Sequence, residues 1–272
     1  MPGIGFLFWN VKQQPLRERI ARLVVAHSCD VVILAECAMA SAVVSRAIND
    51  ATGATFRVVP GSGSELRAFS RLPNAGWRFL LKGQLEQWLA FGLSSPNIPD
   101  LLLLAVHLPS KLRTTDYDRM LVASRLAADI RQLQQQAGHE RAVVVGDFNA
   151  NPFEARVAWA GGLHGVMDAR VAERETREIH GREYSMMYNP MWATFGDRTP
   201  GPPGTYYRVS SESVNYFWNT YDQVLVRPAL IPHLSAVRVL DSDGTDSLLK
   251  PNGLPDDVNA SDHLPLFFRL DW

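Results

Sequence analysis

The chain has 272 residues with 27 basic and 28 acidic side chains, so its net charge of −1 gives no overall attraction to nucleic acid and leaves any such binding to local charge. Its 46% hydrophobic and 20% charged residues are typical of a globular protein. The only cysteines, Cys29 and Cys37, exclude a disulfide framework, a four-cysteine zinc site and a disulfide-linked partner. The longest apolar run, residues 101–106, is too short to cross a bilayer, and residues 1–10 lack a basic leader, so we expect a cytoplasmic protein without a membrane span.

The first part of the chain predicts strands and helices in alternation, followed by a series of strands. An apolar run at 4–9 predicts a buried strand, and Pro15 opens a helix with an apolar face. A strand at 31–34 and a helix at 39–50 follow. Glycine, proline and asparagine then separate short apolar runs, which predicts antiparallel hairpins with strands at 56–59, 66–70, 77–81, 85–92 and 101–106.

The next part predicts one long helix and the strand that follows it. Thr115 and Asp118 have the spacing of a capping box, and Gly138 ends the helix that they begin. The three valines 143–145 are β-branched and suit a strand that is buried on both faces. A polar loop is expected at 241–259, and further strands at 221–226, 237–240 and 264–270.

Helical and strand periodicity is lost between residues 184 and 218, where aromatic side chains stand among prolines and glycines. So long a loop in a compact domain usually has a function, and its aromatic content argues against disorder. The aromatics either pack the loop onto the domain, which we favour, or stack on exposed bases. Without repeats or a linker, residues 1–272 are predicted to form one domain with an aromatic-rich loop insertion at about 184–218.

Four arginines between residues 170 and 182 invite comparison with a phosphate-binding surface. Glutamates alternate with them, so the positive charge is largely cancelled. We therefore predict a solvated helix face there.

Polar residues recur where the predicted apolar strands stop. When two sheets pack together, strand ends from distant parts of the chain converge at one edge. Asp147 and Asn149 follow one such strand and alternate along it, so both point the same way. Each residue alone fits an ordinary surface turn, but the recurrence predicts a site. The residues are Asn10, Glu36, His107, Asp147, Asn149, Asp222, Asp262 and His263.

The chemistry of these residues suits a hard cation and a phosphate ester. Glu36 and Asp262 offer carboxylate oxygens and Asn10 a neutral carbonyl, a set that suits Mg²⁺ or Mn²⁺ better than zinc. The remaining five have distinct predicted roles. His263 exchanges a proton near neutral pH, Asp222 fixes its tautomer, Asp147 orients or deprotonates the attacking water, and His107 and Asn149 hydrogen-bond a phosphoryl oxygen.

Several stretches resemble the endonuclease/exonuclease/phosphatase superfamily. The motifs occur in family order over almost the whole chain, and GDFN and SDH are the most specific of them. They are WN at 9–10, AE at 35–36, VHL at 106–108, GDFNANP at 146–152, YDQVLV at 221–226 and SDHLP at 261–265. The resemblance implies an α/β (α+β) fold, a four-layer α/β/β/α sandwich of two mainly antiparallel sheets with helices outside. It also implies Mg²⁺-dependent phosphoester hydrolysis by a directly attacking water.

By position, the resemblance assigns the metal to Asn10, Glu36 and Asp262, and the catalytic roles to the other five residues as given above. The GTYY stretch at 204–207 resembles a family segment more weakly and implies a substrate contact by Tyr207. Tyr221 stands where many relatives have arginine, and the loop at 184–218 is longer than in the compact abasic endonucleases. These departures leave the catalytic class intact and the substrate open.

Three functions follow from this reading. The favoured one is a metal-dependent nuclease that cleaves phosphodiester bonds of DNA or RNA. The alternative is a phosphatase or phosphodiesterase acting on a small-molecule or lipid phosphoester, which the near-neutral charge and the apolar loop also fit. A catalytically inactive binding module is disfavoured because every expected catalytic position is filled.

Overall fold

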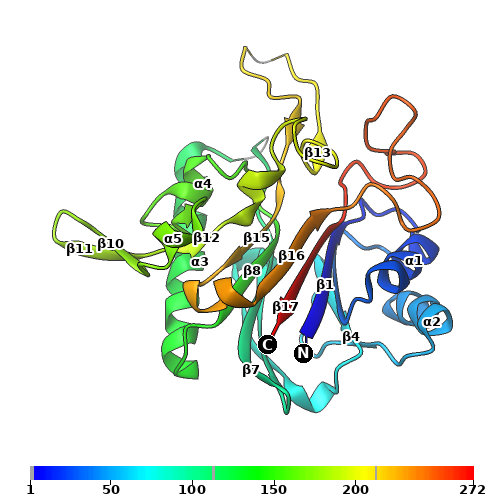
Figure 1. Ribbon diagram of the computed structural model, residues 1–272, viewed down its shortest axis with the longest axis horizontal. Coiled ribbons are helices and arrows are strands. Elements are labelled where there is room, and N and C mark those ends of the chain that lie inside the picture. The colour runs from blue at the N-terminus through cyan, green and yellow to red at the C-terminus, as the bar shows by residue number, and fades with distance from the viewer. Residues whose placement is uncertain (1–2, 112–113, 212) are drawn as a thin grey trace.

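The computed structural model describes residues 3–111, 114–211 and 213–272, and most of its strands belong to two large sheets (Figure 1). The first sheet has the strand order β16 (Leu234–Val239), β17 (Leu266–Asp271), β1 (Gly3–Asn10), β2 (Val31–Ala35), β4 (Leu66–Ser70) and β3 (Arg57–Val58). The second has the order β5 (Trp77–Lys82), β6 (Trp88–Ser95), β7 (Ile98–His107), β8 (Ala142–Asp147), β15 (Asp222–Val226), β12 (Met187–Tyr188) and β9 (Gly165–Val166). Most neighbouring strands are antiparallel, and the described parallel pairs are β1–β2, β7–β8 and β9–β12.

Helices cover the outer face of each sheet. The α-helices are α1 (Arg17–His27), α2 (Ser41–Thr52), α3 (Asp116–Ala137), α4 (Ala155–Ala158) and α5 (Ala169–Ala172). Short 3-10 helices are η1 (Asn74–Gly76), η2 (Gln84–Glu86), η4 (Pro190–Thr194) and η5 (Pro228–His233). Two small hairpins stand apart from the large sheets, and they are β10 (Thr176–Ile179) with β11 (Arg182–Ser185) and β13 (Tyr206–Tyr207) with β14 (Trp218–Asn219). No helix in the described ranges is long and apolar enough to cross a membrane.

Alternation along the strands produces the layers. In β1, Phe6 and Phe8 point into the core between the two sheets, whereas Leu7 and Trp9 pack under α1 and α2. Side chains of α3, such as Leu126, cover the other sheet. The order helix, sheet, sheet, helix confirms the predicted four-layer α/β/β/α sandwich.

Two local predictions were wrong. Residues 170–182 do not form a solvated helix face, because α5 is a single turn and the charged segment after it is the hairpin β10–β11. His180 and Gly181 at its tip have φ of 49° and 74°, the geometry of a two-residue hairpin turn. The strand predicted from residue 85 begins at Trp88, because Leu85 and Glu86 have positive φ and form a turn.

The strand that carries the GDFN motif depends on Gly146. Its φ is +151°, and a Cβ built there would lie 1.9 Å from the backbone oxygen of Val106 on the neighbouring β7. We expect Gly146→Ala to lower the free energy of unfolding by about 2–3 kcal/mol, because the two strands must move apart. Urea unfolding followed by circular dichroism measures this.

Gly53→Ala is the matched control, since Gly53 has φ +68° but nothing lies within 4 Å of its added Cβ. Only backbone strain remains there, about 1 kcal/mol. Equal losses in the two variants would contradict the close approach of β7 and β8.

Candidate active site

The structure brings the polar strand ends together at one edge of the sandwich. β7 and β8 run parallel with His107 opposite Asp147, and Asp222 at the start of β15 is paired with Asp147. The ends of β1 and β2 bring Asn10 and the following Glu36 to the same edge. A cleft of about 980 Å³ opens there. Seven of the nine predicted site residues line it, and they are Asn10, Glu36, His107, Asp147, Asn149, Asp262 and His263.

The other two predicted residues lie elsewhere. Asp222 is fully buried beneath the cleft floor. Tyr207 does not line the cleft, because its ring packs against Phe217 and Trp218. The neighbouring Tyr206 lines the cleft in its place, with its ring centroid 4.6 Å from that of His263.

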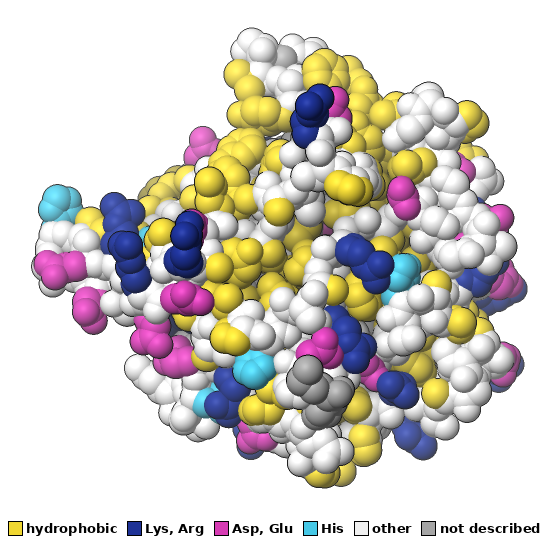
Figure 2. All heavy atoms as spheres, viewed as in Figure 1, with side chains coloured by type: hydrophobic (Ala, Val, Ile, Leu, Met, Phe, Trp, Pro, Cys, Tyr) yellow, Lys and Arg dark blue, Asp and Glu magenta, His cyan; other side chains and the backbone are white. Residues whose placement is uncertain are grey.

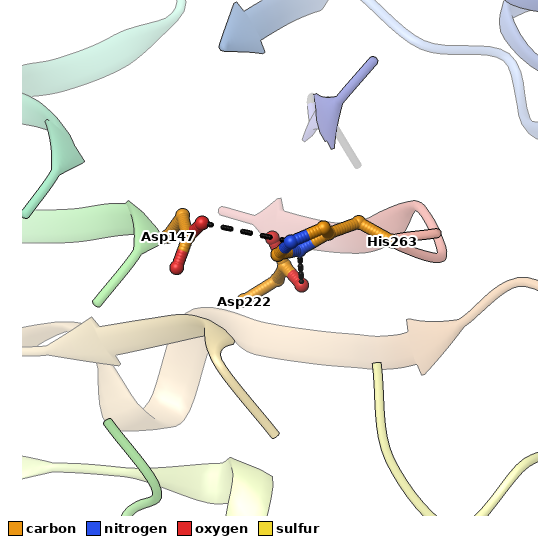
Figure 3. Close-up of side chains that lie close together, drawn as sticks. All are labelled: Asp147, Asp222 and His263. Carbon is orange, nitrogen blue, oxygen red and sulfur yellow. Dashed lines mark hydrogen bonds and ion pairs between the residues drawn. The ribbon is translucent and has the colours of Figure 1, made fainter. Parts of the chain in front are cut away.

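A buried histidine–aspartate pair lies at the centre of the site. His263 Nδ1 is 2.8 Å from Asp222 Oδ2, and His263 Nε2 is 3.9 Å from Asp147 Oδ2 (Figure 3). The backbone N–H of Asp222 donates to Thr205 Oγ1, which fixes the backbone that carries this carboxylate. The imidazole is thereby oriented with one nitrogen toward the buried aspartate and the other toward the cleft.

The electrostatics of this pair favour a proton on the histidine. Burial alone lowers the pKa of His263, but the negative charges of Asp222 and Asp147, and the hydrogen bond to Asp222, outweigh it and raise this pKa to about 10. Burial raises the pKa of Asp222, and the charge of His263 lowers it in turn. The two groups therefore hold one proton between them at neutral pH.

Asn10 links the carboxylates on the other side of the cleft. Its Nδ2 donates to Glu36 Oε1 at 3.1 Å and to Asp147 Oδ2 at 3.2 Å, and its Oδ1 accepts from the backbone N–H of Lys12. His107 Nε2 is 3.5 Å from the same oxygen of Glu36. The amide nitrogen of Asn10, not its carbonyl oxygen, faces the carboxylates in this arrangement.

Asn149 closes the turn after β8. Its backbone N–H donates to Asp147 Oδ1 at 2.8 Å, and its side-chain Nδ2 donates to the carbonyl of Leu108 at 2.9 Å. Its φ of 47° lies in the left-handed region, which asparagine tolerates better than most residues. The turn thus fixes the rotamer of the Asp147 carboxylate.

Backbone strain is concentrated around this cleft. Among the residues that the structure describes, eleven non-glycine residues have positive φ, and six of them line the cleft. Such conformations persist only where the surrounding structure imposes them, and they cluster at functional sites. The six are Lys12, Gln13, Glu36, Leu85, Glu86 and Asn149.

Sequence reasoning missed several residues of the cleft wall. Lys12 Nζ lies 2.8 Å from Asp262 Oδ2, and this hydrogen bond raises the pKa of Lys12. Lys111 pairs with Glu154 and lies over the ring of Tyr221. The sequence signal that could have indicated Lys12 is its position two residues after the predicted site residue Asn10.

The acidic groups fit a divalent cation, but not all equally. Asp147, Asp222 and His263 offer ligand atoms within 4.8 Å of one another. Asp222 and His263, however, are hydrogen-bonded to each other and buried, so those atoms are engaged. The carboxylates of Glu36 and Asp262 are 31% and 23% exposed at the cleft, and hard oxygen donors of this kind suit Mg²⁺ or Mn²⁺.

Comparison with known proteins agrees with this fold. The sequence matches the Endonuclease/Exonuclease/phosphatase family over residues 7–263. Zebrafish (D. rerio) TDP2 complexed with a single-strand DNA product is 18% identical, with 100% of both chains covered and a TM-score of 0.58. Mannosyl-6-phosphatase Bt3783 of Bacteroides thetaiotaomicron is 16% identical, with 99% of this chain and 100% of that chain covered and a TM-score of 0.57. The 3′ phosphatase NExo from Neisseria, bound to a product DNA hairpin, is 17% identical, with 99% and 100% covered and a TM-score of 0.55.

A search of curated proteins found no match. The two-sheet sandwich, with a polar cleft at the strand ends, is the fold of phosphoester hydrolases that depend on divalent metal ions. The chain belongs to the endonuclease/exonuclease/phosphatase family.

Proposed function

We propose that the protein is a Mg²⁺-dependent phosphodiesterase that cleaves nucleic acid by direct attack of water. The observation that carries this proposal is the convergence of the His263–Asp222 pair, Asp147 and two partly exposed carboxylates at one open cleft. An attacking water and a scissile phosphate both need charged groups that are fixed in advance, and the hydrogen bonds of the site fix them.

The metal would be held by Glu36 and Asp262. When bound, Mg²⁺ supplies positive charge that offsets the charge growing on the phosphoryl oxygens. Asn10 orients Glu36 and Asp147 through its amide hydrogens. Asn10 thus holds the carboxylates of Glu36 and Asp147 in place on the side of the cleft where the metal would bind.

Asp147 would orient the attacking water and accept its proton. Its Oδ1 is held by the backbone of Asn149, while Oδ2 faces Asn10 and His263. The second amide hydrogen of Asn149 remains for a phosphoryl oxygen, since an amide nitrogen carries two. The protonated His263 faces the cleft with Nε2 and stabilises the negative charge of the same phosphoryl group.

An aromatic cluster beside the cleft supports a nucleic acid substrate. Phe153 packs against three rings, with centroid distances of 6.2 Å to Trp192, 5.7 Å to Phe195 and 5.2 Å to Tyr216. It is next in sequence to Glu154, which pairs with the cleft residue Lys111. In the view of Figure 2, hydrophobic side chains gather at the upper part of the molecule, while charged side chains cover the β10–β11 hairpin. Exposed bases stack favourably on such rings, with about 1–3 kcal/mol per base.

A second candidate is hydrolysis of a lipid or small-molecule phosphoester. The loop between β13 and β14 exposes Val209, Val214, Tyr216 and Phe217, each at least half exposed to solvent. The aliphatic side chains of Val209 and Val214 do not stack on bases, so these two positions favour a substrate with an apolar part.

Activity assays decide between the two. We expect the protein to cleave labelled single-stranded DNA or RNA in the presence of Mg²⁺, with the activity lost on addition of EDTA and restored by excess Mg²⁺. Release of phosphate or phosphocholine from small or lipid substrates, with all nucleic acids intact, would select the second candidate. Activity that is unaffected by EDTA would contradict the metal-dependent mechanism.

A further inference from the structure

A lysine forms an ion pair with one of the two carboxylates that are expected to hold the metal. Lys12 Nζ lies 2.8 Å from Asp262 Oδ2, and the Lys12 side chain is 45% exposed. Both residues line the cleft. Asp262 therefore already has a cation at one of its two carboxylate oxygens, Oδ2.

The backbone directs this lysine into the cleft. Lys12 and Gln13 have φ of 47° and 59°, two consecutive left-handed residues, neither of them glycine or asparagine. Three hydrogen bonds hold the turn, from the N–H groups of Lys12, Gln13 and Gln14 to Asn10 Oδ1, the Glu36 carbonyl and the Val11 carbonyl. The turn is thus fastened to two other site residues, Asn10 and Glu36.

The two candidate metal ligands are compensated in different ways. Glu36 accepts a hydrogen bond from the neutral amide of Asn10 and lies 3.5 Å from His107. Asp262 is compensated by the full positive charge of Lys12. A divalent ion that binds Oδ2 of Asp262 must displace that ammonium, because two cations at one oxygen repel each other.

We propose that Lys12 is a resident counter-ion of Asp262, which the metal displaces and which then pairs with the substrate phosphate. This inference rests on the proposed metal-dependent function. Displacement leaves the ammonium in the cleft, on a four-carbon stem, where a bound phosphoester supplies its new partner. Lys12 therefore weakens metal binding when substrate is absent and strengthens the binding of substrate when metal is present.

A simple surface ion pair is the competing explanation, since pairs this exposed contribute little to stability. The two explanations differ in what removal of the lysine does to metal affinity. If the pair is a surface pair of no consequence, removing the lysine leaves the metal affinity unchanged, whereas removing a resident counter-ion raises it.

Isothermal titration calorimetry with Mn²⁺ on the full-length protein tests the proposal. Lys12→Met keeps the length of the apolar stem, and we expect it to bind Mn²⁺ about three- to tenfold tighter than the wild type. Lys111→Met is the matched control, because it removes a charge from the same cleft but its lysine pairs with Glu154. We expect less than about a twofold change there, since solvent and salt screen that charge.

Steady-state kinetics at saturating Mg²⁺ give a second readout, in which the variant is expected to bind its substrate more weakly although it binds the metal more tightly. Lys12→Met should raise KM for the phosphoester at least about threefold, because the variant lacks the ammonium that pairs with the phosphate. An unchanged or weaker affinity of Lys12→Met for Mn²⁺ would overturn the proposal. Glu36→Gln separates this result from a failure of the proposed function. If Glu36→Gln still binds Mn²⁺, or if the wild type does not bind it, the proposed metal site is wrong, and the proposal for Lys12 is wrong with it.

Discussion

Asp147→Asn should lower kcat on the phosphoester substrate by about 100- to 10,000-fold, the range that loss of a general base produces. Asparagine matches the shape of Asp147, so the buried space is filled and the fold is retained. The substitution removes the negative charge that we propose accepts the proton of the attacking water. The amide also loses an acceptor oxygen, so the contacts to Asn10 and to the Asn149 backbone cannot both be kept.

Single-turnover rates at saturating substrate measure this effect, and thermal unfolding checks the fold. Asp50→Asn is the control, since Asp50 is an exposed aspartate on α2 outside the cleft. It should retain the wild-type rate. A rate for Asp147→Asn within tenfold of the wild type would remove Asp147 from the chemistry.

Asp222→Asn should have the second-largest effect, again about 100- to 10,000-fold in kcat, because the protonated form and orientation of His263 both depend on this carboxylate. It should also change how stability depends on pH. In the folded wild type the pKa of His263 is about 10, above its ordinary value of 6.5. The stability from this histidine is thus complete below about pH 6.5 and is lost as the pH rises toward 10.

Urea unfolding between pH 6 and pH 10 measures this loss. We expect the free energy of unfolding of the wild type to fall over that range by on the order of a few kcal/mol more than that of Asp222→Asn. His180→Asn, at the exposed tip of the β10–β11 hairpin, should keep the wild-type dependence on pH. Parallel curves for the wild type and Asp222→Asn would show that the pair holds no such proton.

Local patterns predicted the strands and the polar residues at their ends, whereas the four layers were implied by the resemblance to the family. Apolar runs such as 143–145 predict buried strands, and the polar residue that ends each strand lies at the sheet edge wherever the strand is in the sandwich. Asp147 and Asp222 could therefore be placed at one edge before their pairing was known. Family motifs gave the same residues.

The remaining features depend on backbone angles and on contacts across the fold. Nothing in the letters around Lys12 indicates two left-handed residues, and without them the lysine would not reach Asp262. The choice between Tyr206 and Tyr207 follows from the backbone bridge between Tyr206 and His263, which joins segments far apart in the chain. The hairpin at 176–185 was missed because its alternating charges fit a helix surface as well as a strand.

The place of β17 in the first sheet has a consequence for how the protein assembles. This strand lies between β16 and β1, and Gly3 is opposite Asp271, so the two ends of the described chain lie side by side (Figure 1). His263 lies shortly before this strand, and its carbonyl accepts a hydrogen bond from the indole of Trp9, 254 positions earlier. Contacts so distant in sequence form slowly and late. In a polypeptide growing on the ribosome, the candidate site would accordingly stay incomplete until residues 261–271 have emerged and docked.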